Sequence, residues 1–254
     1  MGIYDSSRTR VQPIFDALYR QNKTGTLWLT PLLKLAKRPG KRVAIPNWLD
    51  PLVESPKYEF PVDPPRSFLR WLLENPDKLT KPIEGVKDPI TREKREKLFK
   101  GDQAILQEAI AELYSHDKLL KQAWWRLEGV TKVDCMLRTE STIIFIEGKR
   151  TELGPSRDIT WYPGRNQVLR NLDCAAALAG EIYTNFYVIV IIEGGLLNEQ
   201  RKIELDNIID PKTVNASLPH LSEEQQTLIL EHYLGYITWE EIINTFGLEP
   251  GLLS

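Results

Sequence analysis

The chain has 254 residues, of which 42% are hydrophobic and 27% charged, a balance that supports a folded core and excludes disorder throughout. Two cysteines and three scattered histidines exclude a disulfide framework and a cysteine zinc cluster, and no apolar run approaches the about 18 residues of a membrane span, so we expect a cytoplasmic protein without a membrane partner. The net charge is −2, but the charges are unevenly distributed: the first 100 residues carry 20 basic and 12 acidic groups, and the remainder carries 13 basic and 23 acidic groups. The small net charge therefore does not exclude a nucleic-acid partner.

Residues 1–100 form a basic, proline-rich region in which we expect only short elements. Proline interrupts helices and pushes the residue before it towards extended conformations. The pattern predicts a short helix over residues 65–74, with its apolar side chains on one stripe, and a highly charged helix over residues 91–99. We expect this region to help hold a nucleic acid.

Longer periodic elements begin at Asp102 and predict an α/β core over residues 101–200. In order, the pattern predicts a helix at 102–115, strands at 124–128, 132–138 and 142–149, a helix at 165–179 and a strand at 186–192. The strands at 142–149 and 186–192 are apolar on both faces, which is typical of central strands. A mixed sheet flanked by helices follows from this order.

Residues 201–254 are expected to form an acidic, helical C-terminal extension. Helix starts are predicted by two capping boxes, Ser222 with Gln225 and Thr238 with Glu241. Gly235 would separate the two helices. Because residues 181–254 carry 3 basic against 12 acidic groups, the extension would repel DNA, and we expect it to pack on the protein or to bind a partner.

The chemically distinctive residues gather at the end of the strand over 142–149. If this strand and the one over 132–138 form a hairpin that turns at residues 140 and 141, Asp134 and Glu147 lie directly opposite each other. Two carboxylates at that separation repel unless a cation lies between them. Lys149 projects from the same face as Glu147, because strand side chains alternate with a period of two. The alternative is a cross-strand salt-bridge cluster on a solvated sheet edge.

Two carboxylates beside an ammonium group suit metal-dependent hydrolysis of a phosphodiester. Mg²⁺ is bound by one or two carboxylates together with water and phosphate oxygens. It can polarise the phosphate and acidify a water molecule. Lys149 would then assist the attacking water or stabilise the charge that develops on the phosphate.

The segments Val133-Asp134 and Glu147-Gly148-Lys149, with a following helix that contains Gln167, resemble the PD-(D/E)xK superfamily of restriction-endonuclease-like phosphodiesterases. The resemblance covers about residues 102–195 and implies a core of a helix, a three-stranded antiparallel meander, a helix and a strand. It also implies that Asp134 and Glu147 hold Mg²⁺, for which Mn²⁺ can substitute. By the same resemblance Lys149 is catalytic, and Gln167 lies beside the metal or the scissile phosphate.

Many members of this superfamily place a further glutamate on the helix before the hairpin. Glu108 and Glu112 lie on the predicted helix over 102–115, and Glu128 lies on the first predicted strand. Counted at 100° per residue, Glu112 is nearer than Glu108 to the flank of the apolar stripe. Glu112 is therefore the preferred third metal ligand, and Glu108 and Glu128 remain alternatives.

A polar stripe on the helix after the site is expected to bind substrate. Gln167, Arg170 and Asn171 share one helix face through their spacing of three and four residues. Arg170 can hold a phosphate through two parallel hydrogen bonds. Arg150 adds positive charge beside Lys149, so we expect Arg150, Arg170 and Asn171 to contact the substrate.

The sequence thus predicts a Mg²⁺-dependent endonuclease, with DNA favoured over RNA and endonucleolytic over exonucleolytic cleavage. The alternative is a non-catalytic nucleic-acid-binding or assembly module that retains the nuclease fold. Either is compatible with a homodimer or a protein partner bound through the C-terminal helices.

Overall fold

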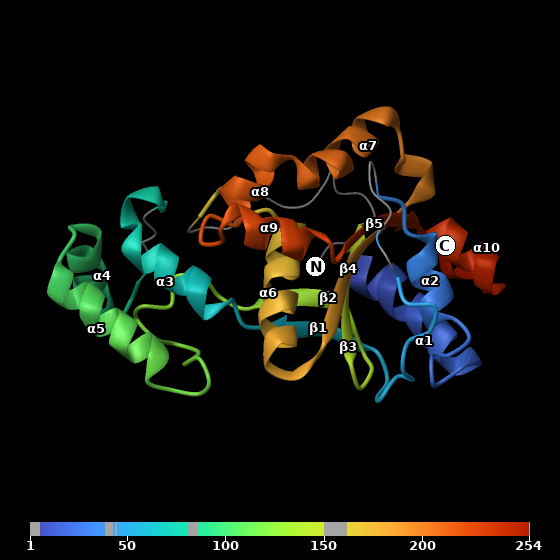
Figure 1. The fold of residues 1–254 in the computed structure, drawn as a ribbon, viewed down its shortest axis with the longest axis horizontal. Helices are drawn as coiled ribbons and strands as arrows, with labels where there is room; N and C mark the ends of the chain where they lie inside the picture. The colour runs from blue at the N-terminus through green and yellow to red at the C-terminus, as the bar shows by residue number, and fades with distance from the viewer. Residues whose placement is uncertain (1–5, 39–42, 44, 81–85, 150–161, 254) are drawn as a thin grey trace.

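The computed structural model describes residues 6–38, 43, 45–80, 86–149 and 162–253, and these residues form an α/β fold around a five-stranded mixed sheet (Figure 1). The strands lie in chain order across the sheet: β1 (Lys57–Val62), β2 (Thr131–Arg138), β3 (Thr142–Lys149), β4 (Asn185–Ile192) and β5 (Tyr233–Thr238). The pairs β1–β2 and β2–β3 are antiparallel, whereas β3–β4 and β4–β5 are parallel. The carboxyl ends of the last three strands therefore meet at one edge, where ligands bind in open α/β sheets.

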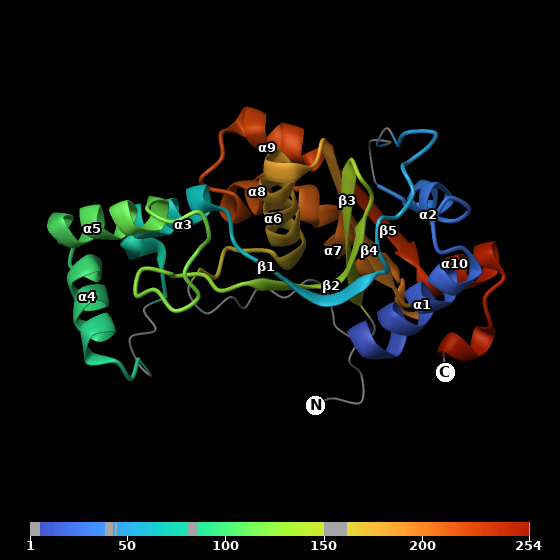
Figure 2. The same ribbon diagram turned by 90° about the horizontal axis from the view of Figure 1, so that it is seen from below.

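Helices cover both faces of the sheet (Figures 1 and 2). The first face is covered by the π-helical turn η1 (Ser7–Val11) and by α1 (Gln12–Gln21), α2 (Leu29–Leu35) and α10 (Trp239–Phe246). The second is covered by α6 (Gln167–Ile182), α7 (Glu199–Asp206), α8 (Pro211–Ser217) and α9 (Glu223–Leu230). Because apolar side chains of β3 and β4 reach into both layers, β3 is buried throughout and β4 is buried after Asn185, as predicted for central strands.

Three further helices form an arm that extends away from the sheet (Figures 1 and 2). They are α3 (Arg66–Glu74), α4 (Pro89–Phe99) and α5 (Gln103–Tyr114), and they pack around an apolar cluster of their own. The arm leaves the sheet after Val62 and returns at Thr131, and these two residues are paired across β1 and β2. All three helices were predicted, at 65–74, 91–99 and 102–115.

The prediction of a strand over 124–128 was wrong. This strand and the helix over 102–115 were expected to begin the core, but the first strand of the sheet is β1, and α5 packs in the arm. Residues 124–128 contain turns instead of a strand, and Trp124 and Trp125 are buried in the cluster of the arm. The sequence did not indicate β1 because this strand is stabilised by pairing with β2, about seventy residues away, and has no local apolar pattern.

The predicted β2–β3 hairpin is confirmed, together with its register. Cys135 pairs with Ile146 and Leu137 with Ile144, and the turn falls where it was expected. The helix predicted at 165–179 is α6, and the strand predicted at 186–192 is β4, which pairs in parallel with β3.

The C-terminal residues were predicted to be helical. In the structure they also contribute a strand to the sheet. Both capping boxes are present and start α9 and α10 at the predicted residues. Between these helices, however, the chain forms β5, the edge strand next to β4. A run of six residues that is buried throughout satisfies its backbone by this pairing, which no local signal in the sequence indicated.

Within the described ranges, every helix is too short or too polar to span a lipid bilayer.

Candidate active site

Asp134, Glu147 and Lys149 come together at the end of the β2–β3 hairpin, as the register predicted. Glu147 is only 1% exposed and Lys149 only 8%. The Lys149 Nζ lies 2.8 Å from the Glu147 Oε1. The Asp134 Oδ2 accepts a hydrogen bond of 2.7 Å from the backbone N–H of Gly148, so the two strands are joined at this point by a side chain.

Gly148 is required between the two charged residues because helices approach it closely from the other face. A Cβ at this position would lie 2.4 Å from a methyl group of Val11 and 3.2 Å from the ring of Trp239. The carbonyl of Gly148 also accepts a hydrogen bond of 2.9 Å from the Ser6 hydroxyl. The end of β3 is therefore clamped from the η1 and α10 side, which leaves Glu147 and Lys149 on the side of α6.

The sheet is distorted where Asp134 lies. Its neighbour on β1 is Glu59, which has a φ of 49° and is the only residue other than glycine with a positive φ in the part of the chain that is described. Such a backbone conformation costs about 1–3 kcal/mol and persists where the surroundings impose it. Glu59 is also close enough to Asp134 for its negative charge to help raise the pKa of Asp134.

The pKa of Asp134 is raised to about 8, first by burial and second by the negative charge of Glu147. The hydrogen bond from Gly148 and the positive charge of Lys149 act in the opposite direction but are weaker. Without a cation, Asp134 therefore holds a proton at neutral pH. A divalent cation would replace that proton and favour the ionised form.

The first turns of α6 supply two amide side chains that reach the carboxylates and the ammonium group. Asn166 caps the start of this helix, and its side chain accepts from the backbone N–H groups of Val168 and Leu169. The Gln167 Oε1 accepts a hydrogen bond of 3.0 Å from the Lys149 Nζ. The Asn171 Nδ2 donates one of 2.8 Å to the Glu147 Oε2, so Glu147 contacts Lys149 through one oxygen and Asn171 through the other.

Asn171 does not face solvent, although it was predicted to bind substrate. Its side chain is fully buried, and its Oδ1 accepts a hydrogen bond of 3.0 Å from the Thr131 hydroxyl. The helix face was assigned correctly from the spacing, but β2 lies against it, so Asn171 contacts protein groups. Thr131 itself was not anticipated, because a threonine at the start of a strand has no distinctive signal.

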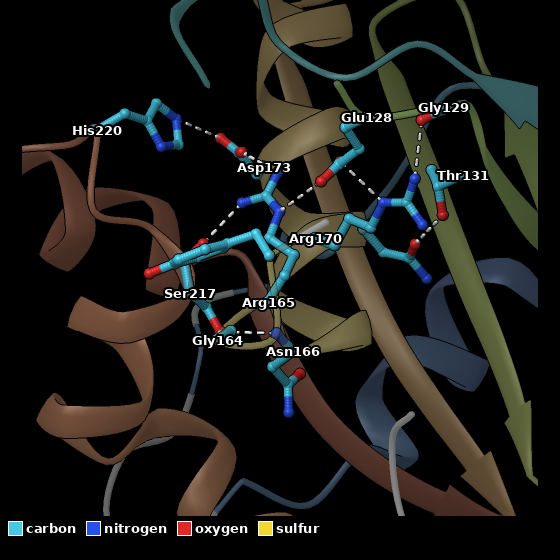
Figure 3. A network of polar contacts seen from close by, with 12 residues as sticks. Glu128, Gly129, Thr131, Gly164, Arg165, Asn166, Arg170, Asp173, Ser217 and His220 are labelled. Atoms are coloured by element: carbon cyan, nitrogen blue, oxygen red, sulfur yellow. Dashed lines mark hydrogen bonds and ion pairs between the residues drawn. The ribbon is translucent and has the colours of Figure 1, made fainter. Parts of the chain in front are cut away.

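Arg170, also predicted to hold a phosphate, is engaged by the segment through which the arm returns to β2. Its Nε donates to the Glu128 Oε1 at 3.0 Å, and a terminal nitrogen donates to the Gly129 carbonyl at 2.8 Å. Figure 3 shows this guanidinium lying between Glu128 and Thr131. With its side chain 15% exposed, Arg170 holds the return segment of the arm against α6.

On the other side of the Glu128 carboxylate from Arg170 lies a buried charge network around Arg165 (Figure 3). Arg165 is fully buried, and its guanidinium lies 2.7 Å from the Asp173 Oδ2 and 3.6 Å from the Glu128 Oε2. It also donates to the Ser217 carbonyl, and it stacks 3.7 Å from the centre of the Phe68 ring. The network thus joins the arm, α6 and the residues after α8.

Asp173 is the second carboxylate of this network. Burial alone would raise its pKa, but the charge of Arg165 and the contact with His220 bring it below its usual range. The His220 Nε2 lies 3.3 Å from the Asp173 Oδ1. Asp173 is therefore ionised in the core and balances Arg165.

The structure does not bring Glu112 to the site, which corrects its prediction as a metal ligand. Its Oε2 accepts a hydrogen bond of 2.7 Å from the indole N–H of Trp125, and Figure 1 places α5 in the arm, away from β2 and β3. Glu108, on the same helix, pairs with Lys94. Glu128 is nearer to the site, but its carboxylate is taken up by Arg165 and Arg170. The error follows from assigning this helix to the core.

Arg150, the remaining predicted substrate contact, lies outside the described residues. In the residues that are described, no group of three or more histidine, cysteine, aspartate or glutamate side chains is placed to hold a metal ion. Any metal bound here would therefore take its protein ligands from the pair Asp134 and Glu147, with water and substrate completing the coordination.

Comparisons with protein-family models, curated proteins and solved structures found no match to this chain.

Proposed function

We propose that the protein is a Mg²⁺-dependent nuclease that cleaves DNA. The observation that carries the proposal is the cluster of half-buried Asp134 with buried Glu147 and Lys149 at the carboxyl end of β3, where the pKa of Asp134 is raised to about 8. Strongly perturbed carboxylates in a charged cluster are typical of catalytic sites. The same arrangement is what the resemblance to PD-(D/E)xK enzymes predicted for these three residues.

The order of elements around the site supports the same proposal. Helix α1, the antiparallel strands β1, β2 and β3, helix α6 and the parallel strand β4 follow the order expected of a restriction-endonuclease-like core. The arm is inserted between β1 and β2, and β5 extends the sheet beyond β4. The core proposed here therefore begins before residue 20, and not at residue 102 as the sequence suggested.

The residues present fit Mg²⁺. Asp134 and Glu147 supply the hard, negatively charged oxygens that this ion prefers, and two carboxylates are enough when water and phosphate oxygens complete its shell. Bound there, Mg²⁺ would supply Lewis-acid chemistry that polarises a phosphate and acidifies water. Mn²⁺, which also prefers carboxylate and water ligands, is the expected substitute.

Lys149 and Gln167 would act on the reacting groups from one side. The contact with Glu147 holds the Lys149 ammonium group at the edge of the buried cluster, and Gln167 fixes its direction from α6. A cation held this way can stabilise the negative charge that develops on a phosphate during attack by water. Lys149 differs in this respect from an exposed lysine, whose ammonium group is not held in one position by protein partners.

A cleft of about 910 Å³ lies at the base of the arm, and Asp134, Glu147 and Lys149 are not among the residues that line it, so it is a candidate surface for a nucleic acid and not part of the charged cluster. It opens between the arm and the core and is lined by Pro65 and Lys118 on the arm side and by Ala177 and Leu178 of α6. Lys121 also lines it and offers positive charge for a phosphodiester backbone, while Asp63 and Asp117 add negative charge to the same cleft. The sequence favours DNA as the substrate and endonucleolytic cleavage as the reaction. It also favours a location in the cytoplasm.

Partner binding through the C-terminal helices is restricted by their packing. The apolar side chains Trp239, Ile242 and Ile243 of α10 are buried in the protein's own core. A homodimer or protein partner at this end of the chain would therefore use the outer surface of α9 and α10, where Leu228 is exposed among polar side chains.

The test is cleavage by the wild-type protein and by Lys149→Ala. Each is incubated with single-stranded, duplex and branched DNA and with RNA, with Mg²⁺ or Mn²⁺. We expect metal-dependent cleavage by the wild type and a loss of about 100-fold or more in the variant. Lys202→Ala is the matched control, because Lys202 is also paired with a glutamate, Glu199, but lies on α7.

Two outcomes would contradict the proposal. Absence of cleavage of every substrate by the wild type would favour the non-catalytic binding module. Equal cleavage by the wild type and Lys149→Ala would show that the nuclease activity, if present, uses other residues.

A further inference from the structure

Glu147 is held by a chain of hydrogen bonds that begins where the arm joins the sheet. The Thr131 hydroxyl donates to the Asn171 Oδ1 at 3.0 Å, and the Asn171 Nδ2 donates to the Glu147 Oε2 at 2.8 Å. All three side chains are buried, with exposures of 3%, 0% and 1%. Water therefore does not compete for these bonds, and each group depends on its protein partner.

The direction of each bond follows from the chemistry of the groups. An ionised carboxylate only accepts hydrogen bonds, so the Asn171 amide must turn its Nδ2 towards Glu147. Its oxygen then points at β2, where it needs a donor. The Thr131 hydroxyl is that donor, and without it the buried oxygen would be left unsatisfied, at a cost of about 1–3 kcal/mol.

We propose that Thr131 is a positioning residue for the active site: its hydroxyl fixes the Asn171 amide, which in turn orients Glu147 for metal binding. The inference rests on the proposed function, because it assigns Glu147 as a metal ligand. Partners that hold a ligating side chain commonly change metal affinity by about 10- to 100-fold when they are removed.

The position of Thr131 also links the base of the arm to Glu147 through these hydrogen bonds. Thr131 is the first residue of β2 and pairs with Val62, the last residue before the arm. Arg170, one residue before Asn171, holds the preceding Gly129 carbonyl. The base of the arm and the orientation of Glu147 are therefore fixed by neighbouring residues of α6, so displacement of the return segment would also loosen Glu147.

The experiment compares Thr131→Val, which keeps the shape but removes the donor, with Thr131→Ser, which keeps the hydroxyl. Thr139→Val is the matched control, because Thr139 is equally buried and its hydroxyl is hydrogen-bonded to Thr142 at the opposite end of the same hairpin. Mn²⁺ affinity is measured by titration calorimetry without substrate. We expect Thr131→Val to bind Mn²⁺ about 10-fold more weakly, and Thr131→Ser and Thr139→Val to bind it like the wild type.

Unchanged Mn²⁺ affinity in Thr131→Val, or an equal loss in Thr139→Val, would overturn the inference. If the wild type binds no Mn²⁺, the proposed function fails, and the hydrogen-bond chain is tested separately by the side-chain amide NMR signal of Asn171. This signal should shift or broaden in Thr131→Val and return in Thr131→Ser. An Asn171 signal that is the same in Thr131→Val and wild type would overturn the chain itself.

Discussion

The carboxyl group of Asp134 has a pKa of about 8 in the folded protein, against 3.8 as its ordinary value. Between about pH 4 and pH 8 the native state therefore binds a proton that the unfolded state has lost. Stability must fall as pH rises through this range, by at most about 1.4 kcal/mol per pH unit from this group. Below about pH 4 both states are protonated, and the contribution is constant.

We predict that Asp134→Asn removes this slope. In the presence of a chelator, the variant should be more stable than the wild type at pH 8, and the difference should shrink towards pH 4. Urea unfolding at a series of pH values measures it. A wild-type stability that rises between pH 5 and pH 8, with the same slope in the variant, would contradict the assigned pKa.

Residue types and spacing were enough to find the charged part of the site. Asp134, Glu147 and Lys149 follow from strand alternation and hairpin register, and these are local geometry. The partners of Asn171 and Arg170 were not predictable, because they lie on β2 and on the arm's return segment, which reach α6 only through the tertiary fold. Helix spacing identified the face but not what covers it.

At the scale of elements, the network around Arg165 holds the arm, α6 and the residues after α8 together. Removing one partner of a buried ion pair leaves the remaining charges uncompensated, and this commonly costs about 3–5 kcal/mol. We predict that Arg165→Met lowers the free energy of unfolding by that amount, because the buried Asp173 would keep only its contact with His220, and the buried Glu128 only its pair with Arg170.

The control for this prediction is Arg70→Met on α3. Arg70 is 52% exposed and forms an ion pair with Glu74 one turn away, so its loss should change the free energy of unfolding little. Urea denaturation of both variants gives the comparison. Similar small losses in the two variants would show that the network does not stabilise the fold as described.

Gly235 allows β5 to pair closely with the segment before residue 39. It has a φ of 93°, and a Cβ there would lie 2.0 Å from the Lys37 carbonyl oxygen. We predict that Gly235→Ala costs about 1–3 kcal/mol in the free energy of unfolding. Gly180→Ala should instead stabilise by about 0.5–1 kcal/mol, because it lies within α6 with open space around it. A neutral Gly235→Ala would contradict the close approach at Lys37.

Among the elements, those with their own periodicity were predicted and those that depend on pairing were missed. Helices α3, α5 and α6 carry apolar stripes that are visible in the sequence. Strand β1 contains Pro61 and a residue with positive φ, features that disfavour a strand when judged locally. Its pairing with β2 outweighs them, and so the sequence alone placed the start of the core too late.

At the scale of the whole molecule, packing brings basic residues from the N-terminal part of the chain next to the acidic C-terminal part. Arg10 forms an ion pair of 2.6 Å with Glu193, Lys37 pairs with Glu241, and Arg38 donates to the Leu230 carbonyl at 2.6 Å. Basic side chains near the N-terminus thus lie against the acidic C-terminal part. The sheet likewise combines β1, from the first hundred residues, with β5, from the last.

The central claim is that Asp134 and Glu147 form one cation site at the end of the hairpin. Titration calorimetry with Mn²⁺ at pH 8 tests it most directly, on the wild type, Glu147→Gln and Glu112→Gln. Glu112→Gln is the matched control, since this glutamate is also hydrogen-bonded but lies in the arm. The account predicts one site in the wild type, no binding by Glu147→Gln and unchanged binding by Glu112→Gln. A wild type that binds no Mn²⁺, or equal binding by Glu147→Gln and wild type, would contradict it.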